Sequence, residues 1–387
     1  MRSGQLSYAP ATCPSIAASP FAANGFSAVP RYTPAMTTLL STPLLAIDVG
    51  AGTQDILLYD PAREPENCLK LVLPSQTQVV GARVRAATEA RRPLHLQGGV
   101  MGGGASSDAM KAHLAAGLPL SATPSAAQTI HNDLERGTAL GVTLRDDAPP
   151  GAMIVETGDI DLAALQAALA PFGVTLPERL AVAVQDHGYQ PGAGANDVRF
   201  AYLQSLLNGG GDLRRMVYTT PPTGMTRMAA VEQAYPGTIL MDTGAAAVLG
   251  ALADPAVGHA AAQDGAILVN VGNMHTFATL VRGARLYGLF EHHTGGITPE
   301  IIRDLVGGLR GGTLDTSGFR SHFDGHGAAL DPAYREVGPF PFVAITGPNR
   351  RLARSLGYHE AAPHGDMMLA GSWGLVAGAA LLEQAER

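Results

Sequence analysis

Cysteine is almost absent from this sequence, and its scarcity excludes two kinds of protein. Only two of the 387 residues are cysteines, Cys13 and Cys68, so a disulfide framework is not expected and a reducing compartment fits best. The closely spaced cysteines that hold a radical-type iron–sulfur cluster are missing. No run approaches the roughly 20 apolar residues of a membrane span. We therefore expect a cytoplasmic protein that does not enter a membrane.

Charged and aromatic residues are also scarce, at 15% and 5% of the chain. The net charge of −7 argues against nucleic acid or an anionic membrane surface as the main partner. Apolar residues make up 46%, which suffices for a large core and excludes disorder across the whole chain. The length suits two or three domains.

The first 42 residues differ in composition from the rest. They are rich in Ala, Ser, Pro and Thr, and no acidic residue precedes Asp48. This low complexity predicts a disordered tail over residues 1–42. The tail lacks the continuous apolar core of a secretory signal. Three explanations of this tail stay open: a transit peptide, an extended reading frame with Met36 as the true start, or a functional tail.

From Leu44 onward, short apolar strands alternate with helical patterns, which predicts an α/β or mixed fold rather than an all-β one. Residues 311–338 show no clear period and are expected to be irregular. The expected strands are 44–48, 56–59, 69–73, 94–97, 152–156, 181–185, 238–241, 266–271, 277–281, 286–290 and 342–346. The expected helices are 107–116, 125–136, 162–169, 197–207, 243–253, 299–305, 350–355 and 367–384.

The most informative segment is residues 44–60, where two apolar runs flank a loop of small residues. This pattern predicts a strand–turn–strand hairpin. Glycines at such a turn let successive backbone N–H groups converge on an anion, and an aspartate at the strand end can hold a divalent cation there. The aspartate is Asp48, and the turn is Gly50, Ala51, Gly52 and Thr53, followed by Gln54 and Asp55. A nucleotide phosphate tail with its metal suits this hairpin. Either Gln54 or Asp55 faces the phosphate, or both are simply turn residues.

Residues 266–280 repeat the pattern, which indicates a duplicated domain. Asn270 stands where the first hairpin has Asp48, and it cannot supply the same negative charge. Two hairpins of this kind that face each other can clamp a polyphosphate between them. The second turn is Gly272, Asn273, Met274, His275 and Thr276.

Three further segments complete an ordered set: small-residue helices in residues 240–254 and 365–382, and a strand–glycine turn–helix start in residues 342–352. The order resembles the superfamily of acetate and sugar kinases, heat-shock chaperone ATPases and actin. That superfamily has two phosphate motifs, an adenosine motif and two connecting helices. More narrowly, the chain resembles a family labelled as pyruvate formate-lyase activating enzymes. Without cluster-binding cysteines, this label does not imply radical chemistry.

The resemblance implies a two-lobed actin-like ATPase fold of duplicated ribonuclease H-like domains, with a large insertion in the first lobe. Lobe one is expected at residues 43–240, with the inserted subdomain at about 94–236. Lobe two is expected at 241–387, with its final helix crossing back to lobe one. ATP and Mg²⁺ are the implied cofactors. The two glycine turns would hold the phosphates, Asp48 and Asn270 would lie beside the metal, and the adenosine would contact Gly347, Pro348 and Asn349.

Three carboxylates are candidate catalytic residues: Asp48, Glu291 and Asp186. Asp186 ends a strand and opens a polar loop, where ligand groups gather in α/β sheets, although a structural Asp–His pair is the alternative. Glu291 precedes His292 and His293, and it can orient water or accept a proton. Zinc binding by this trio is not expected, because no other ligands stand at recognisable spacing. The loop at residues 98–104 is either a second anion site or a lid.

Three functional classes stay open. The first is an ATP-dependent phosphotransferase or ATPase that acts on a small molecule, as the polar loops at 98–104 and 186–196 favour. The second is an activase that drives a conformational change in a partner enzyme, an idea that depends on the family label. The third is a nucleotide-binding regulatory protein with little turnover, which Asn270 favours.

Overall fold

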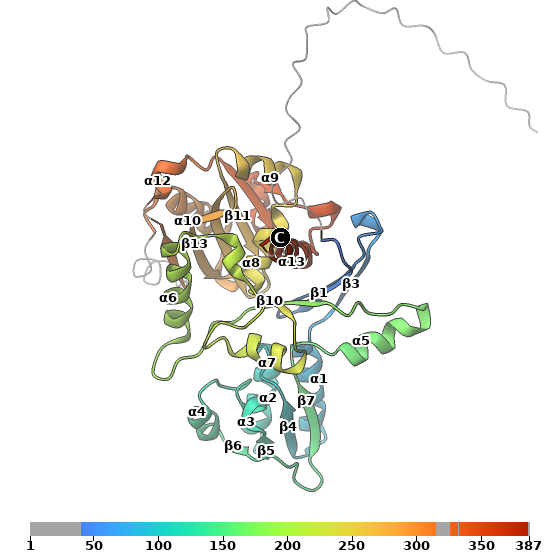
Figure 1. Ribbon diagram of the computed structural model, residues 1–387. Helices are drawn as coiled ribbons and strands as arrows, with labels where there is room; N and C mark the ends of the chain where they lie inside the picture. Colours follow the sequence, from blue (N-terminus) through green and yellow to red (C-terminus); the bar gives the residue numbers. More distant parts are fainter. Residues whose placement is uncertain (1–39, 315–325, 332, 386–387) are drawn as a thin grey trace, which may run out of the picture. The chain divides into compact units, whose positions relative to one another are not determined.

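The computed structural model describes residues 40–314, 326–331 and 333–385. Its first sheet has six strands in the order β3-β2-β1-β8-β10-β9. Figure 1 labels β1, β3 and β10 of this sheet. Strands β1, β2 and β3 form an antiparallel meander, and β8 and β10 continue the sheet parallel to β1. The bounds are β1 Leu44–Val49, β2 Thr53–Tyr59, β3 Leu69–Pro74, β8 Leu180–Val184, β9 Val217–Tyr218 and β10 Ile239–Met241.

A second six-stranded sheet repeats this plan in the order β14-β13-β12-β11-β15-β16. Here β11, β12 and β13 form the meander, and β15 and β16 follow in parallel. The bounds are β11 Ala266–Val271, β12 His275–Arg282, β13 Arg285–His293, β14 Gly327–Leu330, β15 Phe342–Thr346 and β16 His359–Glu360. Two copies of the ribonuclease H-like order confirm the predicted α/β class and the duplication.

A third, all-parallel sheet has the order β6-β5-β4-β7. Its strands are β4 Leu94–Gly98, β5 Leu120–Ala122, β6 Val142–Leu144 and β7 Met153–Thr157, and its helices are α1 Gln76–Glu89, α2 Ala105–Ala115, α3 Pro124–Ala127 and α4 Leu134–Ala139. It corresponds to the early part of the expected insertion. Strands β8 and β9 also fall within residues 94–236 but pair in the first sheet. The division into lobes at 43–240 and 241–387 stays a prediction.

The two small-residue helices, α8 Thr243–Ala251 and α13 Ala370–Ala385, cross with their backbones in contact. A Cβ atom on Gly250 would lie 1.7 Å from the Ala370 carbonyl oxygen, and one on Gly374 would lie 1.8 Å from that of Ala246. Helix α13 also packs on β1, β2 and β8 of the first sheet. Its Trp373 is buried edge-on against Tyr59. The two small-residue helices expected from the sequence are thus present, and their glycines permit this close contact.

The remaining helices cover the sheets and connect them. They are α5 Leu162–Leu169, α6 Ala195–Asn208, α7 Thr226–Ala234, α9 Pro255–Ala262, α10 Pro299–Gly311 and α12 Tyr334–Val337. The sequence did not predict α1, α7 or α9, and the helix expected at 350–355 is a 3₁₀ helix, Arg350–Leu356. The region expected to be irregular contains β14 and α12, and the predicted tail with Cys13 lies almost wholly outside the described residues.

Two expectations from the sequence, the lack of a membrane span and the lack of a disulfide, can be compared with the described part of the chain. No single helix there is long and apolar enough to cross a bilayer, and only α8 and α9 taken together, bent by 92°, reach that length and composition. Cys68 is buried and forms no disulfide.

Candidate functional site

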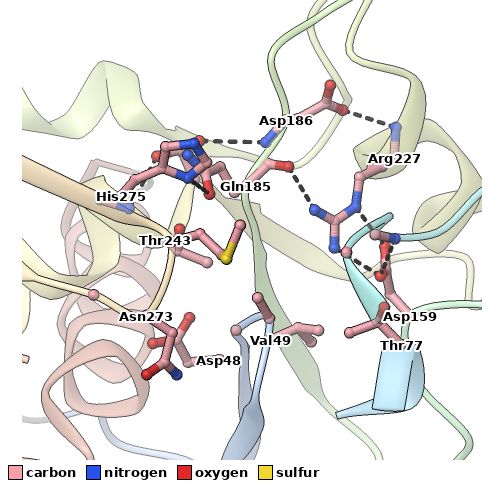
Figure 2. Close-up of a pocket in the computed structure, with 18 of the residues that line it drawn as sticks. Asp48, Val49, Thr77, Asp159, Gln185, Asp186, Arg227, Thr243, Asn273 and His275 are labelled. Atoms are coloured by element: carbon pink, nitrogen blue, oxygen red, sulfur yellow. Dashed lines mark hydrogen bonds and ion pairs between the residues drawn. The ribbon is translucent and has the colours of Figure 1, made fainter. Parts of the chain in front are cut away.

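A cavity of about 430 Å³ lies where the two predicted hairpins meet (Figure 2). The turns have the same geometry, because the Gly50 amide donates to the Thr53 carbonyl at 2.8 Å and the Gly272 amide to that of His275 at 2.9 Å. The strand registers also match, with Asp48 opposite Asp55 and Asn270 opposite Phe277. The cavity volume lies within the range of small-molecule sites.

The structure brings most of the predicted site residues to this cavity. The lining includes Asp48, Gly50, Ala51, Thr53, Asp186, Asn270, Gly272, Asn273, Met274, His275, Glu291, Gly347 and Pro348. Four predicted residues are not among the lining residues: Gly52, Gln54, Thr276 and Asn349.

Each of these four residues has a local contact instead. A Cβ on Gly52 would lie 3.0 Å from Asn273 Nδ2, so this glycine permits the close approach of the two turns. The Thr276 hydroxyl is 3.1 Å from that of Thr294. The Asn349 side chain donates to the Gly272 carbonyl at 3.0 Å, which ties the predicted adenosine motif to the second turn.

Side chains along β2 point alternately to its two faces, and this shows which of Gln54 and Asp55 faces the cavity. Gln54 donates to the Pro74 carbonyl at 3.0 Å, whereas Asp55 lines the cavity beside Asp48. Successive strand residues point to opposite faces, so Thr53 and Asp55 share a face that Gln54 cannot share. Of the two residues, Asp55 is therefore the one that faces the cavity, and Gln54 points to the other side of the sheet.

Half-buried Asp48 and buried Asp55 form a pair of carboxyl groups on neighbouring strands. Each has an Oδ1 atom that is buried without a hydrogen-bond partner among the described residues. Burial raises the pKa of Asp48 well above its usual value, and the charges of Asp55 and Asp242 raise it further. Burial likewise raises the pKa of Asp55 to about 7, against a hydrogen bond from Thr53. Like charges opposite each other are unfavourable unless a proton or a cation lies between them.

The raised pKa of Asp55 predicts a pH-dependent gain in stability for Asp55→Asn. The folded state retains the proton between the unfolded value of 3.8 and about 7, so wild-type stability falls as pH rises through that window. Asparagine does not titrate. The free energy of unfolding of the variant should therefore equal that of the wild type near pH 4 and exceed it by up to about 4 kcal/mol above pH 7. Urea unfolding in EDTA at several pH values measures the difference, and a difference independent of pH would contradict the assignment.

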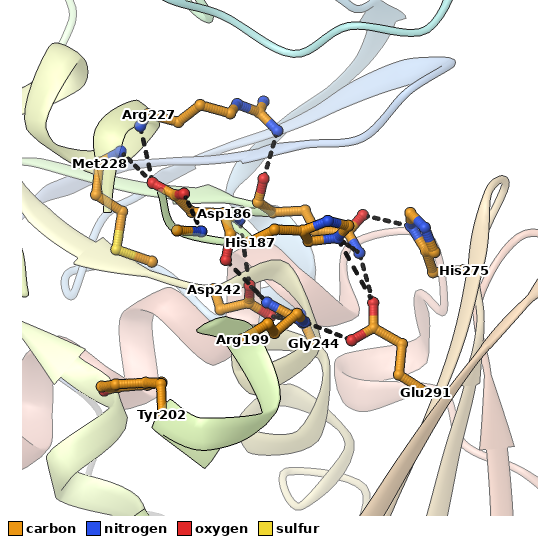
Figure 3. A network of polar contacts seen from close by, with 12 residues as sticks. Asp186, His187, Arg199, Tyr202, Arg227, Met228, Asp242, Gly244, His275 and Glu291 are labelled. Carbon is orange, nitrogen blue, oxygen red and sulfur yellow. Dashed lines mark hydrogen bonds and ion pairs between the residues drawn. The ribbon is translucent and has the colours of Figure 1, made fainter. Parts of the chain in front are cut away.

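Arg199 of α6 joins both sheets at the other side of the cavity (Figure 3). Its guanidinium donates to Asp242, the residue that caps α8, at 2.9 and 3.3 Å. Its Nε donates to Glu291 Oε2 on β13. Burial alone would lower the pKa of Arg199, but the two carboxylates outweigh it and raise the pKa. A buried charge is tolerable only with such pairing.

Glu291 is fully buried and surrounded by imidazoles from distant segments. Its Oε1 accepts from the Gln185 amide at 2.7 Å and lies 3.7 Å from His326 Nδ1 and 4.0 Å from His187 Nε2. Burial opposes ionisation, but Arg199 and the histidines lower its pKa to about 2. A carboxylate with this pKa is a weak base at neutral pH, so its contacts suit a ligand or counter-ion better than a proton acceptor.

Asp186 accepts hydrogen bonds at both carboxylate oxygens. Oδ1 accepts from the Gly188 amide, and Oδ2 accepts from the amides of Arg227 and Met228 at the start of α7. These contacts with backbone amides favour a structural role for Asp186 over a catalytic one. Burial still raises its pKa, against those backbone hydrogen bonds.

The loop at residues 98–104 forms the far end of the cavity. Its Gly102 amide donates to Asp159 at 2.9 Å, and Asp159 also pairs with Arg227 at 2.7 Å. Arg227 in turn donates to the Gln185 carbonyl at 2.6 Å (Figure 2). The third sheet is thus joined through buried polar groups to the end of β8.

Together, the two ribonuclease H-like sheets, the paired glycine turns and the crossing helices define a protein of the actin-like ATPase and sugar kinase fold class. The chain belongs to the family described as "Putative pyruvate format-lyase activating enzyme (DUF1786)", whose model matches residues 101–352, well over half of the sequence. Both levels of the predicted resemblance are thereby confirmed.

Solved structures of this class align with most of the chain at low similarity. The ethanolamine utilization protein EutJ from Carboxydothermus hydrogenoformans is 12% identical with a TM-score of 0.29, covering 88% of this chain and 90% of its own. Inorganic polyphosphate/ATP-glucomannokinase from Arthrobacter sp. strain KM is 11% identical with a TM-score of 0.31, covering 89% and 100%. Lmo2764, a putative N-acetylmannosamine kinase from Listeria monocytogenes, is 11% identical with a TM-score of 0.33, covering 88% and 100%. Among curated proteins, none matches the sequence.

Proposed function

We propose that this protein binds ATP with Mg²⁺ in the cavity between the two glycine turns and directs the γ-phosphate to water or to a small molecule. The observation that carries the proposal is a pair of turns, Gly50–Thr53 and Gly272–His275, that are closed by the same backbone hydrogen bond and contribute residues to one cavity. Backbone amides at such turns favour anions. The predicted adenosine motif is hydrogen-bonded to the second turn through Asn349, which suits a nucleotide that spans both.

The residues of the first hairpin fit a magnesium ion. Mg²⁺ binds oxygen ligands and is usually held by one or two carboxylates together with phosphates. Asp48 and Asp55 both line the cavity, and each has one carboxyl oxygen without a partner among the described residues. Asp242 adds negative charge near Asp48. When bound, the ion would neutralise phosphate charge and help to align the γ-phosphate.

The far end of the cavity is the region for a phosphoryl acceptor. It is lined by three glycines of the loop at 98–104, Gly102 to Gly104, and by polar residues of α1 and of the segment between α3 and α4, among them Thr77, Thr129 and Asn132. Hydroxyl and amide groups of this kind suit a small polar molecule. The acceptor itself is not defined by these residues.

A second candidate function, nucleotide binding with little turnover, is favoured by two observations. Asn270 occupies the position that corresponds to Asp48, so the second hairpin contributes no carboxylate to the cavity at that point. Glu291 is committed to Arg199, which leaves it poorly suited to activate water. A regulatory protein or an activase of a partner enzyme would need only the binding step.

Nucleotide binding is tested by calorimetry with ATP in Mg²⁺ and in EDTA, using the wild type and Gly272→Ala. A Cβ on Gly272 would lie 2.7 Å from the His275 carbonyl oxygen and would open the turn. We expect the variant to lose at least about tenfold in affinity, about 1.4 kcal/mol. Gly295→Ala is the matched control, because nothing lies within 4 Å of its added methyl group.

Two outcomes of this experiment are decisive. Equal affinity of wild type and Gly272→Ala, with an unchanged melting temperature, would contradict the phosphate site. Steady-state phosphate release by the wild type then separates the two functions, because tight binding without release would favour the regulatory one.

A further inference from the structure

Four side chains from separate parts of the chain converge beside the second glycine turn. Each offers one ligand atom, and these four atoms lie within 4.8 Å of one another. We call them the histidine cluster: His187, His275, Glu291 and His326. They come from the loop after β8, the start of β12, strand β13 and the residue before β14. Figure 3 shows His187, His275 and Glu291 pointing toward one another.

We propose that the histidine cluster binds a divalent transition-metal ion of the zinc and iron class. Imidazole nitrogen is a preferred ligand of these ions, and three imidazoles with one carboxylate match their donor sets. Magnesium prefers oxygen ligands, so this site is distinct in chemistry from the carboxyl pair of the first hairpin.

The distances suit a shared ion better than direct hydrogen bonds. Glu291 Oε1 lies 3.7 Å from His326 Nδ1 and 4.0 Å from His187 Nε2, which is too far for a hydrogen bond. Two ligand atoms at about 2.1 Å from one ion lie about 3 to 4 Å apart, depending on the angle between them. If each of the four ligand atoms moved inward by less than about 1 Å, all four would lie at coordination distance from one central ion.

Neighbouring polar groups orient the ligands. The Gln185 amide donates to Glu291 Oε1, and its oxygen therefore accepts from His275 Nδ1 at 2.7 Å. This contact fixes the tautomer of His275 that leaves its Nε2 lone pair available. His326 Nε2 is 3.0 Å from His293, which leaves Nδ1 as the atom that faces Glu291. Supporting hydrogen bonds of this kind are typical of metal-ligating histidines.

The charges near the cluster are also compatible with a cation. Arg199 contacts Oε2 of Glu291, whereas the imidazoles lie near Oε1. The positive charge of Arg199 is also paired with Asp242. Burial lowers the pKa of His187, His275 and His326 to about 4, so each is neutral at pH 7, which is the form that binds metal.

The position of the cluster gives the ion access to a ligand in the cavity. His187, His275 and Glu291 all line the cavity, and His275 belongs to the second glycine turn. An ion held there is therefore close to whatever occupies that turn. It would act as an electrophile toward an oxygen or nitrogen group of the bound molecule.

The test measures metal content without nucleotide, so its result is independent of ATP binding. Full-length protein purified without chelators is analysed for Zn, Fe, Mn, Co and Ni by mass spectrometry, alongside His187→Ala/His326→Ala. We expect about one equivalent in the wild type and less than a tenth of that in the double variant. His131→Ala is the matched control, because His131 lines the same cavity outside the cluster and should retain its metal.

Stripped wild type is then titrated with Co²⁺, and the visible spectrum and the shifted imidazole N–H proton signals are recorded. Three such signals are expected, and this readout needs no variant to fold. Absence of Zn²⁺ and Co²⁺ binding in the stripped wild type would overturn the proposal. Metal retained equally by a folded double variant, or lost equally by His131→Ala, would also overturn it.

Discussion

Replacing Gly250 with alanine should destabilise the protein by about 3 kcal/mol or more, the largest effect that we expect from a single methyl group. The added Cβ would lie 1.7 Å from the Ala370 carbonyl oxygen and 3.0 Å from the Gly374 amide nitrogen. Neither atom belongs to a flexible side chain, so α8 and α13 must separate. That separation would also disturb the packing of α13 on the first sheet.

Gly307→Ala is the matched control for this prediction. Gly307 lies within α10 with nothing within 4 Å of an added methyl group. Alanine in a helix interior is favoured over glycine by about 0.5–1 kcal/mol, so the control should be neutral or slightly stabilising. Chemical denaturation measures both variants. A Gly250→Ala protein as stable as the wild type would show that the helices do not touch at this crossing.

Replacing Asp48 with asparagine should lower the affinity for Mg²⁺-ATP by about a hundredfold or more. Unit charges 4 Å apart interact by about 4 kcal/mol at an effective dielectric of 20, and a divalent ion doubles that attraction. The same change should stabilise the protein without metal near neutral pH, because it removes a carboxyl group whose ionisation burial opposes, as its raised pKa shows. Calorimetry with ATP in Mg²⁺ and in EDTA, with melting temperatures, measures both effects.

The opposite signs of the two effects distinguish a lost ligand from a damaged fold. Asp60→Asn is the control, because it removes the same charge from the end of the same hairpin, where Asp60 pairs with Arg63 outside the cavity. It should leave the affinity unchanged. A Mg²⁺ dependence that survives in Asp48→Asn would place the metal elsewhere.

Local patterns made much of the fold predictable. The hairpins at Leu44 and Ala266 involve neighbouring strands, so strand propensity and turn glycines were enough to find them. Helix α1 was missed although its buried positions recur at helical spacing, because Thr77 and Gly81 stand on that face where large apolar residues would give a clear signal. Helix α9 was missed for a similar reason, since most of its residues are alanine or glycine.

The candidate site was less predictable because its parts meet only through tertiary structure. Asp55 could have been chosen over Gln54 from strand alternation, since Thr53 and Asp55 are two residues apart. No spacing indicates that His187 and His326, 139 positions apart in the sequence, share a site with Glu291. Arg199 had no sequence signal, because a single arginine in a helix is usually exposed.

The buried indole of Trp373 makes the helix crossing visible to spectroscopy. It is the only tryptophan in the chain, so all tryptophan emission comes from one position. Trp373 is 1% exposed, and the centroid of its ring lies 4.2 Å from that of His364. Two residues before it stands Gly371, where an added Cβ would collide with Asp48. Separation of α8 from α13 would admit water and shift the emission to longer wavelength. The protein thus carries an intrinsic fluorophore that reports on this crossing without any attached label.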